Sequence, residues 1–136
     1  LRKALADDPK VLLMGEDIGP LGGVFRVTEG LQAEFGANRV IDTPLAESGI
    51  VGTAIGLAMR GYRPVCEIQF DGFIFPGFDQ ITSQLAKLTA RHEGSLSMPV
   101  VIHNHRRKKW LGSGCSSKAR CAWQRWRKMV TAEIVM

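Results

Sequence analysis

The sequence has little of what marks several common classes of protein. It contains no run of about 18 apolar residues, so it predicts no transmembrane helix and no membrane partner. Its three cysteines, Cys66, Cys115 and Cys121, are too few and too scattered for the framework of a disulfide-rich domain. Apolar residues make up 45% and charged residues 23%, which excludes collagen and a disordered low-complexity chain.

Signals for secretion, phosphate binding and metal binding are missing too. The first residues contain neither an initiator methionine nor an apolar signal core, so we expect the sequence to begin inside a longer protein. The glycines of residues 15–23 do not follow the G-x-G-x-x-G spacing, and there is no G-x-x-x-x-G-K-S/T motif. His103 and His105 precede Cys115 and Cys121 at spacings that match no common zinc pattern, so no metal site is expected.

Charge is distributed unevenly along the chain. The formal net charge is +5, yet residues 1–101 hold nine Lys and Arg against twelve Asp and Glu, whereas residues 102–136 hold nine against one. All three Trp also lie in the second segment, and 13 of the 15 Gly lie in the first. This change of character near Ile102 predicts two segments that need separate interpretations.

Short apolar runs alternate with helical patterns in the first segment. Strands are predicted at 11–14, 40–41, 65–70 and 98–102, and helices at 1–7, 27–35, 46–59 and 76–92. This order predicts an α/β fold, a parallel sheet with helices on both faces. Ligands of such sheets bind beyond the carboxyl ends of the strands, which directs attention to residues 15–17, 42–47 and 69–73.

Several side chains at these positions have two interpretations. Glu47 opens a helix, where a carboxylate either stabilises the helix dipole or faces a ligand. Glu67 and Gln69 share one face of a buried strand, so they need either a polar network or a ligand. The aromatic cluster that contains Phe73 suits a core, a subunit interface or a cofactor ring. The adjacent carboxylates Glu16 and Asp17 are expected to be solvated.

The helix of residues 46–59 carries three glycines near one face, Gly49, Gly52 and Gly56. Glycine destabilises a helix interior by up to about 1 kcal/mol per position. We therefore expect another backbone to approach this face.

Five motifs in register point to one family. They are Gly15-Glu16-Asp17-Ile18-Gly19, Gly22-Gly23-Val24-Phe25-Arg26-Val27-Thr28, Asp42-Thr43-Pro44-Leu45-Ala46-Glu47, Glu67-Ile68-Gln69-Phe70-Asp71-Gly72-Phe73 and Phe78-Asp79-Gln80. From residue 1 to about 102 the chain resembles the E1 beta subunit of the 2-oxoacid dehydrogenase complexes. The motifs resemble the branched-chain type most and the pyruvate type next.

The resemblance implies the three-layer, parallel-sheet pyrimidine-binding domain of the thiamine-diphosphate (transketolase-like) group, here incomplete. It implies that Glu47 bonds N1′ of the cofactor's aminopyrimidine ring and favours the imino tautomer that takes the proton from thiazolium C2. Leu45, Gln69 and Phe73 match other positions around that ring, although many relatives carry Tyr in place of Phe73.

The resemblance also implies partners. In this family the diphosphate and its magnesium are held by an alpha subunit, in an alpha2-beta2 tetramer that decarboxylates a branched-chain 2-oxo acid or pyruvate oxidatively. The acyl group then passes to a lipoyl-bearing E2. Such enzymes are cytoplasmic in bacteria and lie in the mitochondrial matrix of eukaryotes. Another transketolase-like thiamine enzyme is the alternative within the same group.

The resemblance ends where the composition changes. The family continues past Ile102 with an arginine, a proline and a glycine-rich turn, but this chain continues with His103-Asn104-His105 and basic residues. We expect residues 1–102 to be a partial domain that is inactive alone, and residues 103–136 to be an unrelated, disordered tail created by a shift of reading frame. The alternative is a tail that binds nucleic acid or an anionic surface through Arg and Trp.

Overall fold

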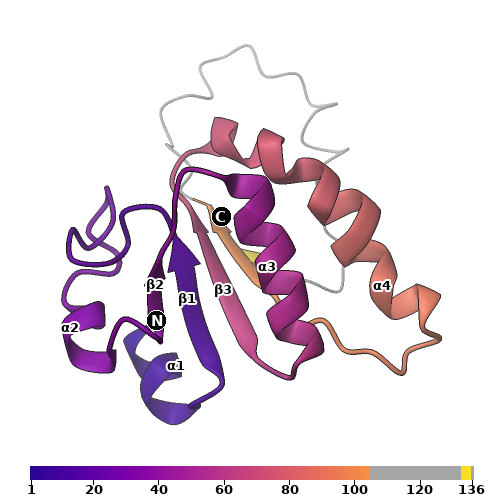
Figure 1. Ribbon diagram of the computed structural model, residues 1–136, viewed down its shortest axis with the longest axis horizontal. Coiled ribbons are helices and arrows are strands. Elements are labelled where there is room, and N and C mark those ends of the chain that lie inside the picture. The colour runs from indigo at the N-terminus through magenta and orange to yellow at the C-terminus, as the bar shows by residue number, and fades with distance from the viewer. Residues whose placement is uncertain (105–132, 136) are drawn as a thin grey trace.

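A parallel sheet organises the chain. The structure, a computed structural model, describes residues 1–104 and the backbone of residues 133–135. Every pair of neighbouring strands is parallel, in the order β2-β1-β3-β4-β5 (Figure 1). The strands are β1 (Val11–Gly15), β2 (Val40–Asp42), β3 (Arg63–Ile68), β4 (Val101–Asn104) and β5 (Glu133–Val135). The predicted α/β class with a parallel sheet is therefore confirmed.

Helical segments connect the strands and cover the sheet. They are α1 (Arg2–Asp7), α2 (Leu31–Phe35), α3 (Glu47–Met59), the 3-10 helix η1 (Asp71–Gly77), the π-helix η2 (Gln80–Leu85) and α4 (Ala86–Arg91). Figure 1 shows α3 and α4 in front of the sheet, with α1 and α2 beside β1 and β2. Within the described residues no helix is long and apolar enough to cross a membrane.

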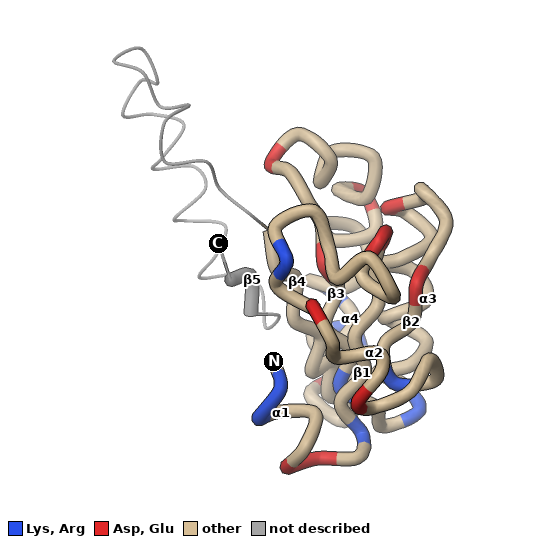
Figure 2. The backbone as a smooth tube through the Cα atoms, turned by 90° about the vertical axis from the view of Figure 1, so that its left-hand side faces the viewer, with Lys and Arg blue, Asp and Glu red and all other residues tan. Residues whose placement is uncertain are grey.

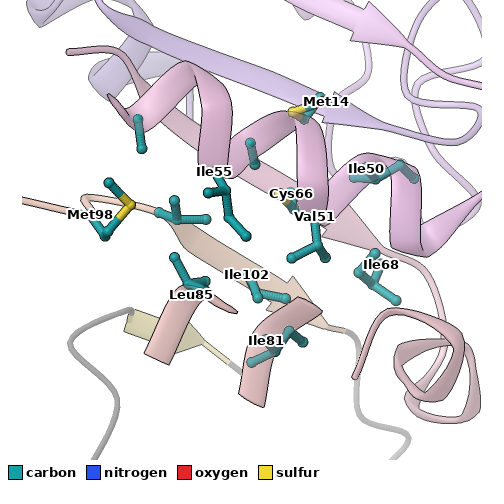
Figure 3. Packing of buried hydrophobic residues seen from close by; sticks show 13 residues of the cluster. Met14, Ile50, Val51, Ile55, Cys66, Ile68, Ile81, Leu85, Met98 and Ile102 are labelled. Atoms are coloured by element: carbon teal, nitrogen blue, oxygen red, sulfur yellow. The ribbon is translucent and has the colours of Figure 1, made fainter. Parts of the chain in front are cut away.

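The larger core lies between the sheet and α3 with η2. Val51 and Ile55 of α3 point toward Cys66 of β3, and Ile81 and Leu85 of η2 complete the layer against Ile102 (Figure 3). These side chains are almost fully buried.

The Cys66 thiol belongs to this apolar layer. Burial raises the pKa of the Cys66 thiol to about 12, because no solvent or cation stabilises a thiolate there. The cysteine is free and buried, so it acts here as a small apolar side chain.

The opposite face carries a smaller core under α1 and α2, formed by Leu5, Val11, Leu13, Ile18, Leu31, Val40 and Val65. Side chains that alternate along β1 and β3 enter different cores, because successive residues of a strand point to opposite faces. This confirms the predicted helices on both faces.

The amino end of the sheet is held by Arg39, directly before β2. Its guanidinium donates hydrogen bonds to the backbone oxygens of Val11 (2.8 Å), Leu5 (3.0 Å) and Asp8 (2.9 Å). Arg63, the first residue of β3, forms an ion pair with the Asp8 carboxylate at 3.4 Å. Arg39 thus fastens the end of α1 to the start of β1, and Arg63 adds an ion pair to the turn between them.

The predicted helix at 27–35 is wrong in its first half. Helix α2 begins only at Leu31, after Gly30 with φ of 75°. Arg26 also has a positive φ of 59°, so the chain turns there instead of continuing a helix. The four-residue spacing from Val27 to Leu31 is therefore accidental, whereas the predicted end of the helix at Gly36 is confirmed.

Both boundaries of two strands, and one helix, also differ from the prediction. β3 begins and ends two residues earlier than expected, and β4 begins three residues later and continues to Asn104. The helix expected at 76–92 is preceded by η1 and changes to a π-helix at Gln80. Phe78 lies three residues before the buried Ile81, at a spacing that predicts a shared helix face, but Phe78 is 40% exposed.

The described residues place no other backbone against the glycine face of α3. A Cβ atom at Gly56 would meet nothing within 4 Å, and one at Gly49 or Gly52 would meet only side-chain atoms at ordinary contact distances. The backbone that is expected to approach this face is therefore not one of the described residues, and its approach stays a prediction.

Candidate functional site

The carboxyl ends of the strands gather the predicted site residues. The register pairs Gly15, the last residue of β1, with both Asp42 of β2 and Glu67 of β3. The segments that follow these strands therefore meet at one end of the sheet. Acidic residues predominate at that end, toward the top of Figure 2, and most basic residues lie toward the other.

Gln69 links two of these segments. It is 7% exposed, and its Nε2 donates a hydrogen bond of 3.0 Å to the backbone oxygen of Glu16. Gly15 allows the two strands to approach, because a Cβ atom there would lie 2.6 Å from the backbone oxygen of Glu67. Gln69 thus fixes the loop after β1 against the end of β3.

Glu16 differs from the solvated carboxylate that the sequence suggested. Its side chain is partly buried, and this burial raises the pKa of the Glu16 carboxyl above its ordinary value. The negative charges of Asp17, Glu47 and Asp42 raise the pKa further, in that order. The sequence placed Glu16 directly after a strand, but only the fold brings Asp42 and Glu47 close to it.

Glu47 is the first residue of α3 and is partly buried. The start of this helix is fastened to η1, because the Ser48 hydroxyl donates a hydrogen bond of 2.8 Å to the backbone oxygen of Pro76. Gly77 packs on the same turn, where an added Cβ atom would lie 3.2 Å from the backbone oxygen of Glu47. The carboxylate is therefore carried by a helix end that two contacts hold in place.

Exposed apolar side chains lie in the segments around this carboxylate. Leu45 is 67% exposed, two residues before Glu47, and Phe73 of η1 is 41% exposed. The Phe73 ring packs edge-on against Phe70, with ring centroids 5.3 Å apart, and Phe70 meets Phe25 at the same distance. An open apolar surface beside a carboxylate can receive a flat ring with a polar edge.

Two polar atoms at this end of the sheet were not predicted from the sequence. The Thr43 hydroxyl, just after β2, is buried and forms no hydrogen bond with the described residues. Oδ1 of Asn104, at the end of β4, is also buried without a hydrogen bond to the described residues. Nδ2 of the same side chain donates a hydrogen bond of 3.1 Å to the backbone oxygen of Phe70. Thr43 belongs to one of the sequence motifs, but the sequence did not indicate that its hydroxyl or Oδ1 of Asn104 is buried, because burial depends on the packing of distant segments.

A shallow depression of about 480 Å³ lies elsewhere, over the loop after β1 and α2, and is lined by Gly19, Pro20, Gly30, Gln32, Ala33 and Ala37. None of Leu45, Glu47, Gln69 and Phe73 lines it. The candidate site is therefore an open surface at the strand ends, not this depression.

Much of the predicted tail lies outside the described residues. This holds for His105, Cys115, Cys121 and the Trp-containing basic segment. Among the described residues, no group of three or more His, Cys, Asp and Glu side chains could hold a metal ion. His103 and Asn104, the first two residues after the predicted boundary, form the end of β4.

The fold and the strand-end site define an α/β domain that presents a carboxylate and apolar side chains at the carboxyl edge of a parallel sheet. Residues 1–104 match the family described as "Transketolase, pyrimidine binding domain". The chain belongs to this family.

Known relatives share the same part of the chain. The pyruvate dehydrogenase E1 component subunit beta of Leifsonia xyli subsp. xyli is 80% identical over 102 residues, which cover 75% of this chain and 30% of the relative. The 3-methyl-2-oxobutanoate dehydrogenase subunit beta of Mycobacterium tuberculosis is 59% identical over 102 residues, 75% of this chain and 29% of the relative. A pyruvate dehydrogenase E1 component subunit beta of Staphylococcus aureus is 57% identical over 104 residues, 76% of this chain and 32% of the relative.

These findings confirm the family resemblance over the first hundred residues. The chain spans about a third of the length of these relatives. The identity is higher to the pyruvate-type chain of Leifsonia xyli than to the M. tuberculosis chain named for 3-methyl-2-oxobutanoate, the reverse of the order that the motifs suggested.

Proposed function

We propose that residues 1–104 are the part of an E1 beta subunit that receives the aminopyrimidine ring of thiamine diphosphate in a 2-oxoacid dehydrogenase. The observation that carries the proposal is the position of Glu47, a carboxylate on a fixed helix start at the ligand edge of the sheet. The names of the relatives support the same activity, oxidative decarboxylation of pyruvate or a branched-chain 2-oxo acid.

The residues present fit this ring. Leu45 and Phe73 offer exposed apolar surface, and Glu47 offers a carboxylate for the polar edge of the ring. The acidic character of this end, with Glu16 and Asp42 near Glu47, is unfavourable for a diphosphate. This supports the proposal that an alpha subunit holds the diphosphate and its magnesium.

Each side chain has a defined task in this proposal. Glu47 holds a proton at N1′ of the ring, and Leu45 and Phe73 pack against the ring and exclude water from it. Gln69 positions the loop after β1 through its hydrogen bond to Glu16 and borders the ring. When bound, thiamine diphosphate supplies the carbanion-stabilising chemistry, and the protein supplies orientation and a path for protons.

Because this chain carries half of the site, it requires an E1 alpha subunit, in an alpha2-beta2 assembly, and a lipoyl-bearing E2 that accepts the acyl group. We propose residues 1–102 as the partial domain and residues 103–136 as a segment of different origin, whose first two residues, His103 and Asn104, complete β4. The match to relatives over 102 to 104 residues supports this division. The compartment follows the source, cytoplasm in a bacterium and mitochondrial matrix in a eukaryote.

The proposal is tested by cofactor binding. The 136-residue chain is co-expressed with the E1 alpha subunit of the same source, and thiamine diphosphate binding is measured by calorimetry in the presence of magnesium. We expect Glu47→Gln to weaken binding by at least about tenfold, because the amide cannot supply the charge at N1′. The rate of 2-oxo acid decarboxylation by the assembly with Glu47→Gln should be about 10²–10⁴-fold lower than with the unsubstituted chain.

Glu29→Gln is the matched control, since Glu29 is an exposed carboxylate in the loop before α2. It should leave binding unchanged. Equal affinity of the Glu47→Gln variant and the unsubstituted chain would refute the role of Glu47. Decarboxylation of any 2-oxo acid by the purified chain without an alpha subunit would refute the half-site itself.

A further inference from the structure

A buried ion pair joins two neighbouring strands below the candidate site. Glu67 of β3 is 6% exposed, and its Oε2 contacts Nδ1 of His103 on β4. The two residues are direct register partners in the parallel ladder. The His103 side chain is 22% exposed, so the pair is largely withdrawn from water.

Among the described residues, few other charges surround this pair. Among the described side chains, the Glu67 carboxylate is the one whose charge acts on the imidazole. On the far side of Glu67 the register partner is Gly15, which has no side chain. Within residues 1–104, the Glu67 carboxylate is therefore the main electrostatic partner of His103.

We infer that Glu67 and His103 form a proton-dependent clamp between β3 and β4. When the imidazole is protonated, a charge-assisted hydrogen bond compensates the buried carboxylate. When it loses its proton, Glu67 remains buried with a neutral partner, which weakens the contact between the strands. The clamp does not require the cofactor. Because Glu67 lies two residues before Gln69, weakening of the clamp should also make the strand end at the candidate site less rigid.

The direction of the pH effect follows from the contacts. The hydrogen bond to Glu67 raises the pKa of His103 above its ordinary value of 6.5, burial opposes this, and the charge of Glu67 adds to the rise. A group whose folded pKa is raised stabilises the fold fully below its unfolded pKa. This stabilisation is lost as the pH rises through the folded pKa. The domain should therefore lose stability between about pH 6.5 and the higher pKa of the folded state.

The test uses the full 136-residue chain. The ring signals of His103 are followed by NMR during a pH titration, and urea unfolding is measured at pH 6 and at pH 8.5. We expect a titration midpoint above 6.5 that moves down in Glu67→Gln, and an unfolding midpoint that is lower at pH 8.5. His103→Arg, which keeps the positive charge at both pH values, should abolish the pH dependence of unfolding.

His92→Gln is the matched control, because His92 is an exposed histidine at the end of α4. It should leave the pH dependence as it is. The clamp is refuted if the imidazole of His103 titrates with a midpoint at or below pH 6.5, which is also the result expected from an unfolded chain. It is refuted too if the His103→Arg variant keeps the full pH dependence of unfolding. If Glu67→Gln does not fold, the unsubstituted chain and His103→Arg still decide between these outcomes.

Discussion

At the amino end of the sheet a single guanidinium closes the chain onto itself, whereas at the carboxyl end polar and apolar side chains are left open. Arg39 uses its nitrogens on three backbone oxygens of α1, β1 and the turn between them. At the other end Leu45 and Phe73 remain exposed, and the Thr43 hydroxyl has no hydrogen-bond partner among the described residues. The backbone oxygens at the amino end of the sheet are therefore hydrogen-bonded within the domain, whereas the side chains at the carboxyl end remain available to bind a ligand.

The largest expected effect on stability comes from the closed end. Arg39→Ala removes three hydrogen bonds to backbone oxygens, and we expect a loss of about 2–4 kcal/mol in the free energy of unfolding. Arg39→Lys should recover only part of it, because an ammonium cannot reproduce the planar fork. Urea unfolding monitored by circular dichroism measures both.

Arg60→Ala is the control for the closed end, since Arg60 is exposed after α3 and should change stability by less than about 0.5 kcal/mol. Equal losses in the Arg39→Ala and Arg60→Ala variants would show that Arg39 is not a fastening point.

The second effect concerns the point where β1 and β3 approach beneath the open end. Gly15→Ala introduces a Cβ atom 2.6 Å from the backbone oxygen of Glu67, so the strands must separate. We expect a loss of about 1–3 kcal/mol, measured by thermal and urea unfolding.

Gly56→Ala is the matched control for this position, because we expect it to increase the stability of the domain whereas Gly15→Ala should decrease it. Its Cβ atom meets nothing within 4 Å, and alanine stabilises a helix interior by about 0.5–1 kcal/mol relative to glycine. A destabilised Gly56→Ala variant, or an unaffected Gly15→Ala variant, would contradict the assignment of the two glycines.

The smallest effect belongs to the open end itself. Phe73→Tyr adds a hydroxyl to an exposed ring, and we expect thiamine diphosphate affinity in the presence of the alpha subunit to change by less than about tenfold. Phe75→Tyr, on the 72% exposed neighbour, should change nothing. A loss of more than about 100-fold in thiamine diphosphate affinity in the Phe73→Tyr variant would contradict this, because it would mean that the complex leaves no room for a hydroxyl on the Phe73 ring.

The sequence predicted the α/β class because its signals are local. Apolar runs such as Val11–Met14 need no distant partner to be recognised as buried strands, and the motif that ends in Glu47 is one of five short motifs that together carry the family resemblance. The errors are local as well. Nothing in the spacing of Val27 and Leu31 announces the positive φ of Arg26 and Gly30, which ends the helical pattern.

The sequence by itself determined the alternation of strands and helices, the placement of helices on both faces of the sheet and the position of Glu47 after a strand. Only the tertiary structure decided which charges meet there. The partial burial of Glu16, its proximity to Asp42 and Glu47, and the pairing of Glu67 with His103 depend on segments that are distant in the chain. Periodicity reports which face of an element is apolar, whereas electrostatic interactions depend on distances between elements, which only the packed sheet defines.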